Sequence, residues 1–164
     1  MNRKGDDMEL YLVQHGAAAT KEEDPNRPLN ETGRALSKRA AAHAARLGVR
    51  VAEIRHSTKL RAIQTAEEFE AALGAPRREV EGLDPDDDVS PLRREVQSRT
   101  ENLLVVGHLP FLARLAAALL CQNESMPAVG FRQAGLVKLE RAEGGTWSLT
   151  WALPPDIMPE PEEI

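Results

Sequence analysis

The stretch NLLVVGHLPFLARLAAALL, residues 102–120, decides the fold. Its first part, 102–107, is an apolar run without helical spacing, which is typical of a strand covered on both faces. Pro110 suits the first turn of a helix, and the residues that follow it are apolar apart from Arg114. The stretch therefore predicts a buried strand and an apolar helix over about 110–120, joined at His108.

Two earlier segments repeat this strand-to-helix pattern. Residues 8–13 (MELYLV) and 51–56 predict further strands. A helix is predicted after the first of them, capped by Asn30 and ending at Gly48, and its buried face is expected at Leu36, Ala40, His43 and Leu47.

The second strand is followed by a helix that runs to about Leu73, capped by the hydroxyl of Ser57 or Thr58. Beyond it the pattern predicts a short edge strand, an acidic loop, a short helix and a closing hairpin, over 77–81, 83–91, 92–99 and 136–153 respectively. Strands that alternate with helices favour an α/β three-layer sandwich, with a mainly parallel central sheet, helices on both faces and an antiparallel hairpin at one edge.

The length of 164 residues predicts a single domain, which we place at 8–153 with flexible termini at 1–7 and 154–164. The tail is rich in proline and acidic residues, so an extended or disordered chain is expected there.

Composition excludes several classes of protein. The net charge of −5 and the aromatic content of 4% argue against nucleic-acid or anionic-membrane binding. The one cysteine, Cys121, rules out an internal disulfide and is expected to be a buried, inert thiol. With no apolar signal segment at the N-terminus and one cysteine, the sequence predicts a cytoplasmic protein. It has no Cys-x-x-Cys or His-rich cluster for a zinc site, and no metal or other cofactor is expected.

Three strand-to-helix junctions carry residues suited to phosphate. His15 follows the first strand, Arg61 lies just inside the helix after the second, and His108 follows the third. Such junctions gather at the carboxyl edge of a parallel sheet. A cation in the first turn of a helix costs about 0.3–1 kcal/mol unless an anion is present, and Gly16 allows close backbone approach beside His15. These positions predict an oxyanion site.

Four motifs in one order resemble the histidine phosphatase superfamily, and within it the small SixA-type phosphohistidine phosphatases. The first is Gln14-His15-Gly16 at the end of the first strand. The others are RPLNETG at 27–33, STKLRAIQTA at 57–66 and VVGHLP at 105–110. Together they span roughly 8–153.

The resemblance implies that His15 takes the phosphoryl group to give a covalent phosphohistidine, while Arg61 and His108 hold the phosphoryl oxygens. Two interpretations of Arg27 remain open: it contacts phosphate or the phosphorylated partner, or it is a solvated loop residue. Gln14 stands where the family has arginine. Replacing a charged bidentate donor by a neutral one removes about 1–2 kcal/mol of oxyanion stabilisation, which is about ten- to thirtyfold in rate.

The same resemblance implies a phosphohistidine-bearing partner, either a phosphotransfer domain or a phosphocarrier protein. Without a long insertion over the site, the site is expected to be open enough for a protein substrate. If esters are cleaved, the acid is expected among Glu22, Glu23 and Asp24 or in the loop 84–88. Asp86 and Asp88 are the first candidates. Two alternatives remain open: a catalytically impaired phosphate- or phosphoprotein-binding module, and a phosphatase for small phosphate esters.

Overall fold

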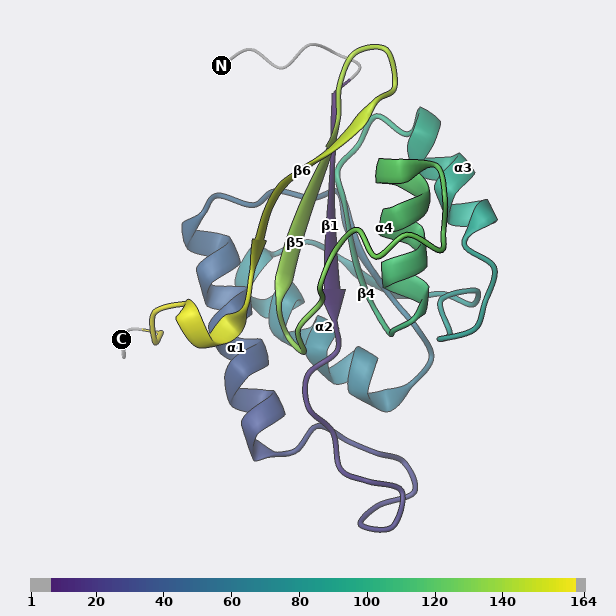
Figure 1. The fold of residues 1–164 in the computed structure, drawn as a ribbon. Helices are drawn as coiled ribbons and strands as arrows, with labels where there is room; N and C mark the ends of the chain where they lie inside the picture. The colour runs from purple at the N-terminus through teal and green to yellow at the C-terminus, as the bar shows by residue number, and fades with distance from the viewer. Residues whose placement is uncertain (1–6, 162–164) are drawn as a thin grey trace.

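One mixed sheet forms the centre of the molecule in the computed structural model, which describes residues 7–161 (Figure 1). Its strand order is β3-β2-β4-β1-β5-β6. The strands are β1 (Met8–Gln14), β2 (Glu53–His56), β3 (Arg77–Glu79), β4 (Leu103–Gly107), β5 (Leu136–Arg141) and β6 (Trp147–Leu153). The four strands from β3 to β1 pair in parallel, whereas β5 and β6 form an antiparallel hairpin against β1. The predicted mainly parallel sheet with an edge hairpin is confirmed.

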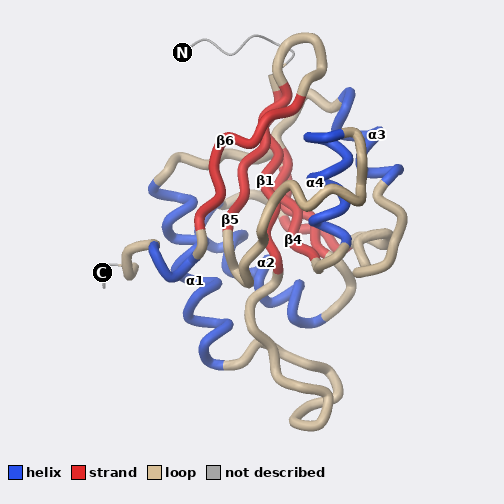
Figure 2. The backbone as a smooth tube through the Cα atoms, viewed as in Figure 1, coloured by secondary structure: helices blue, strands red, loops and turns tan. Residues whose placement is uncertain are grey.

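Helices cover both faces of this sheet (Figure 2). One face carries α1 (Glu31–Arg46) and α2 (Leu60–Leu73), and the other carries α3 (Ser90–Ser98) and α4 (Phe111–Cys121). Within the described residues, no helix is long and apolar enough to cross a membrane.

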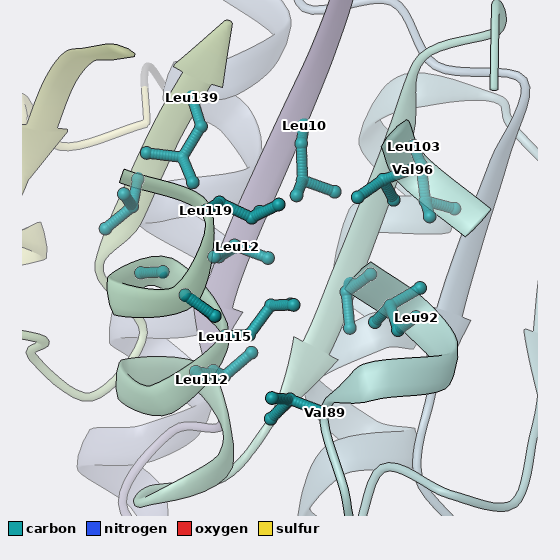
Figure 3. Packing of buried hydrophobic residues seen from close by; sticks show 14 of the residues in the cluster. Leu10, Leu12, Val89, Leu92, Val96, Leu103, Leu112, Leu115, Leu119 and Leu139 are labelled. Atoms are coloured by element: carbon teal, nitrogen blue, oxygen red, sulfur yellow. The ribbon is translucent and has the colours of Figure 1, made fainter. Parts of the chain in front are cut away.

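The core follows from the alternation of side chains along β1 and β4. Leu12 and Val105 lie in the cluster beneath α3 and α4, while Val13 and Val106 lie in the cluster beneath α1 and α2. Figure 3 shows leucines of α4 packed between the strands and α3. Because burial of one such side chain contributes about 1.5–3 kcal/mol, these two clusters hold β1 and β4 firmly in the centre of the sheet.

The buried face of α1 differs from the prediction. Asn30 does cap the helix, since its side chain accepts a hydrogen bond from the Gly33 amide. The residues that α1 buries are Gly33, Ser37, Ala40, Ala41 and Ala44. Leu47 is 47% exposed. Small side chains let the helix approach the sheet and the loop after β1 closely, and that close approach selects the face.

Two further predictions, on Cys121 and on the C-terminal tail, are wrong. Cys121 is exposed at the end of α4 and is not a buried thiol. The tail after 153 is not extended throughout, because η1 (Pro155–Ile157) is a 3-10 helix and Met158 is buried in the cluster beneath α1. The predicted flexibility of 1–6 and 162–164 falls outside the described residues.

Candidate active site

The carboxyl ends of β1 and β4 bring the two predicted histidines together. The strands are adjacent and parallel, with Gln14 opposite Gly107, and the His15 amide donates to the Gly107 carbonyl at 3.0 Å. His15 and His108 therefore leave the sheet side by side. Their ring centroids lie 5.0 Å apart, and the ring planes are inclined by 50°.

His15 is held in one tautomer. Its Nδ1 lies 2.7 Å from the Gly16 carbonyl oxygen, and since a carbonyl only accepts, Nδ1 carries the hydrogen. Nε2 then holds a lone pair, which accepts a long hydrogen bond of 3.4 Å from Nε of Arg61.

The charge state of His15 follows from burial. Burial lowers the pKa of His15 to about 4, and the charges of Arg61 and Arg27 add to this effect against the hydrogen bond to Gly16. The ring is neutral at physiological pH, as a nucleophilic imidazole must be.

His108 is more deeply enclosed, with 1% of its surface exposed. Its Nε2 lies 2.6 Å from Oγ of Ser57, and its buried Nδ1 has no hydrogen-bond partner among the described residues. Burial, followed by the neighbouring His15, Arg61, Lys59 and Arg27, lowers the pKa of His108 to about 3. A neutral His108 whose Nε2 accepts from Ser57 carries its hydrogen on Nδ1, where it can serve as a donor.

Two arginines act on both rings. Arg61 stands in the first turn of α2, where no acidic residue and no side-chain cap balance the helix end. Burial and the nearby Arg27 lower the pKa of Arg61, while Asp84 acts in the opposite direction. Arg27 adopts a φ of 47° and donates from Nε to the Ala19 carbonyl. Its charge also lowers the pKa values of His15 and His108.

Comparison with known proteins finds similar sequences and similar folds. The family model of the histidine phosphatase superfamily (branch 1) matches residues 10–85. A Picosynechococcus protein described as uncharacterized is 34% identical over 140 residues, which is 80% of this chain and 84% of the relative. The phosphohistidine phosphatase SixA of Escherichia coli is 29% identical over 155 residues, covering 90% of this chain and 94% of SixA.

A solved structure of the protein histidine phosphatase SixA complexed with tungstate superposes with a TM-score of 0.80 at 26% identity, over 91% of this chain and 98% of that one. The chain belongs to the histidine phosphatase superfamily. Within that superfamily it is SixA-like in fold and in extent, and it is a phosphatase by family.

Gly16 has a packing role in this superfamily member. A Cβ at Gly16 would lie 2.6 Å from Oγ of Ser37 and 2.9 Å from the Gly33 carbonyl oxygen. The Gly16 amide donates to Oγ1 of Thr65 at 3.0 Å, and that hydroxyl donates to the Arg61 carbonyl. Because the amide is already bonded, we assign Gly16 to packing and to the tautomer of His15, not to the predicted phosphate contact.

Gln14 lies at the same edge of the sheet. Its carbonyl accepts from the Ala134 amide at 2.8 Å, and the side-chain amide makes no hydrogen bond with any described residue. Whatever the Gln14 amide contributes to an oxyanion, it brings no positive charge.

The acidic loop does not present the two predicted acids to the histidines. Asp88 Oδ1 accepts from the Ser90 amide, and this bond lowers the pKa of Asp88, which is the wrong direction for a general acid. Asp86 is exposed. The Asp84 carboxylate of this loop does act on Arg61, and its Oδ2 lies 3.9 Å from Nζ of Lys59.

Sequence reasoning missed three contributors: Ser57, Lys59 and Thr65. Ser57 was expected to cap α2, but its hydroxyl contacts His108, and the N-cap of α2 is Lys59. All three lie in the motif at 57–66, so the motif itself was the available signal. Within residues 7–161, no group of three or more His, Cys, Asp or Glu side chains is arranged to hold a metal ion.

Proposed function

We propose that this protein removes phosphate from phosphohistidine on a protein, through a covalent phosphohistidine intermediate on His15. The observation that carries the proposal is the neutral His15 ring, with Nδ1 hydrogen-bonded to Gly16 and the lone pair of Nε2 facing Arg61. A fixed lone pair beside a guanidinium suits attack on a phosphoryl group whose oxygens need positive charge.

In the first step, Nε2 of His15 forms a bond to phosphorus, and the phosphorus–nitrogen bond of the substrate breaks. Its electron pair stays on the leaving imidazole. The His15 ring becomes cationic, and the Gly16 carbonyl stabilises that cation through Nδ1–H. Arg61, Arg27 and His108 hold the equatorial oxygens.

In the second step, water attacks the phosphorus and the bond to Nε2 breaks. The electron pair returns to Nε2, the water proton goes to the phosphate, and neutral His15 is restored. No step requires a metal ion.

The surroundings of the site favour an imidazole leaving group over an alkoxide. The side chains that lower the pKa values of His15 and His108 include the cations Arg61 and Arg27, and the nearby Asp84 carboxylate faces the cations Arg61 and Lys59. An alkoxide needs a proton as it leaves, whereas an imidazole protonated on its other nitrogen leaves as a neutral molecule. The SixA relative is itself named a phosphohistidine phosphatase. We therefore infer a cytoplasmic phosphotransfer domain or phosphocarrier as substrate.

The direct test is phosphate release from a phosphohistidine-bearing phosphotransfer protein, combined with trapping of radioactive phosphate on His15. We expect His15→Ala to reduce the rate on the order of 10⁴-fold or more, because the nucleophile is lost. His43→Ala on α1 is the matched control and retains activity.

Two other outcomes would replace this proposal. Phosphate that binds without labelling His15 points to a binding module, which the uncharged Gln14 favours. Faster turnover of aryl or sugar phosphates than of phosphohistidine points to an ester phosphatase.

A further inference from the structure

A third cation, Lys59, lies at the start of α2, at a position of the motif 57–66 to which the sequence alone assigned no role. Lys59 is the N-cap of α2, and its amide lies 3.3 Å from Oγ of Ser57, the hydroxyl that contacts Nε2 of His108. The backbone of Lys59 therefore lies next to the hydroxyl that holds His108, and Lys59 precedes Arg61 by two residues. Its side chain is about one-third exposed, with 36% of its surface accessible.

The partner of Lys59 is a carboxylate shared with Arg61. Nζ of Lys59 lies 3.9 Å from Oδ2 of Asp84, too far for a hydrogen bond, and Asp84 also acts on the guanidinium of Arg61. The pair is weak because both side chains are partly solvated and the geometry is loose.

Asp84 keeps its place through the loop and not through Lys59. Nη2 of Arg114 on α4 donates to the carbonyl oxygens of Pro85 and Asp87 at 3.1 and 2.8 Å. Oδ2 of Asp87 in turn accepts from the Asp84 amide at 2.8 Å. The loop therefore holds the Asp84 carboxylate in place, while the Lys59 side chain is partly exposed and makes no hydrogen bond to it.

We propose that Lys59 is a phosphoryl-binding residue, and that Asp84 is an internal counter-ion which a phosphoryl dianion displaces from Lys59. The site has three cations, Arg27, Lys59 and Arg61, and the carboxylate of Asp84. The net charge of these four side chains is therefore +2, which matches the charge of a phosphoryl dianion. Lys59 supplies charge that Gln14 does not, and its charge lowers the pKa of His108. The inference rests on the proposed function for its substrate class.

The test is to measure the equilibrium binding of inorganic phosphate and of tungstate by isothermal titration calorimetry. We expect Lys59→Met to weaken binding about tenfold, as loss of one charge-assisted hydrogen bond does. Lys38→Met, an exposed lysine on α1, is the matched control and leaves binding unchanged. Asp84→Asn should tighten binding about threefold or more, because a weak competing ion pair is removed.

The double variant sharpens the test. If Asp84 competes for Lys59, the gain from Asp84→Asn shrinks in the Lys59→Met background. Wild-type affinity in Lys59→Met, an equal loss in Lys38→Met, or an undiminished gain from Asp84→Asn in that background would each overturn the proposal. Binding needs no turnover. A wild type that binds phosphate but releases none from phosphohistidine contradicts the proposed function alone.

Discussion

Two groups of charged side chains near β2 differ in how fully carboxylates balance their positive charges. The first, which we call the paired cluster, alternates arginines with carboxylates: Glu53, Arg55, Arg78, Glu95 and Arg99. The second, which we call the site cations, has three positive side chains and the single carboxylate of Asp84: Arg27, Lys59 and Arg61.

The arginines of the two groups respond differently to burial. Burial alone lowers the pKa of Arg55, but hydrogen bonds to Glu95 and Glu53 reverse the effect and raise it overall. Burial and Arg27 lower the pKa of Arg61, and Asp84 only partly opposes them. The fold thus neutralises the buried Arg55 with carboxylates and leaves the partly buried Arg61 short of negative charge. This difference supports the proposal that the site cations bind an anion, whereas the paired cluster fits a structural role.

The largest effect should come from removing one arginine from each group. Arg61→Met should lower kcat/KM about 10²–10³-fold, because a charged donor to the phosphoryl oxygens is lost, while stability holds. Arg55→Met should leave kcat/KM near that of the wild type but cost about 3 kcal/mol of stability, since Glu53 and Glu95 lose their partner. Urea unfolding and steady-state kinetics on both variants measure this. Equal losses of activity and stability in the two variants would break the comparison.

Acid should destabilise the fold in two phases that begin at different pH, the first from the histidines beside the site cations and the second from the paired cluster. His15 and His108 titrate near 6.5 when unfolded but near 4 and 3 when folded, so the unfolded chain binds more protons below pH 6.5. The unfolding free energy therefore falls as pH drops from 6.5 toward 4, by about 1.4 kcal/mol per pH unit for each histidine.

The paired cluster follows at lower pH. Burial acts to raise the pKa of Glu53, but Arg55, Arg78 and Arg99 outweigh it and hold that pKa below its ordinary value of 4.5. The stability from Glu53 is present above pH 4.5 and is lost as the pH falls through the folded value. Urea titrations between pH 7.5 and 3.5 should show both phases, and His15→Asn should flatten only the upper one. An unchanged upper phase in that variant would refute the assignment.

Additional charge at the site should have a smaller effect on rate. Gln14→Arg should raise kcat/KM on a phosphohistidine protein about ten- to thirtyfold, because an ionised donor adds about 1–2 kcal/mol of oxyanion stabilisation. Gln133→Arg is the control, since its backbone bridges that of Gln14 while its side chain is exposed. A rate increase in both variants would show that general charge, and not a contact, is responsible.

The smallest effect is expected in the acidic loop. Asp86→Asn and Asp88→Asn should change kcat/KM on phosphohistidine by less than about twofold, because Asp86 is exposed and Asp88 bonds the Ser90 amide. Measurements on an aryl phosphate complete the test. A large loss in either variant with either substrate would restore that carboxyl as the proton donor.

Much of this arrangement could be predicted from the sequence because it depends on strand ends. The apolar runs at 8–13 and 102–107 mark two parallel strands, and each is followed by a histidine, so His15 and His108 had to meet at one edge. The hairpin was also readable, since its two strands flank Glu143-Gly144-Gly145.

What could not be predicted depends on packing between distant segments. The face of α1 was set by close approach to the loop after β1, because the carbonyl oxygen of Ala17 lies 2.0 Å from where a Cβ of Gly33 would stand. Ser57 had two possible uses, and only the position of His108 decided between them. The burial of Met158 depends on its contact with the cluster beneath α1, which no local pattern reveals.

The hydrogen bond from the His15 amide to the Gly107 carbonyl has a consequence for re-engineering the molecule. It makes the spacing of the two imidazoles a property of the strand ladder, whereas the segments 17–28 and 83–89 that surround them are loops. If the proposed function holds, the other positions of those loops can be exchanged to retarget the protein toward another phosphorylated partner, with Arg27 and Asp84 kept. A library restricted to those positions would therefore explore specificity at little risk to the catalyst.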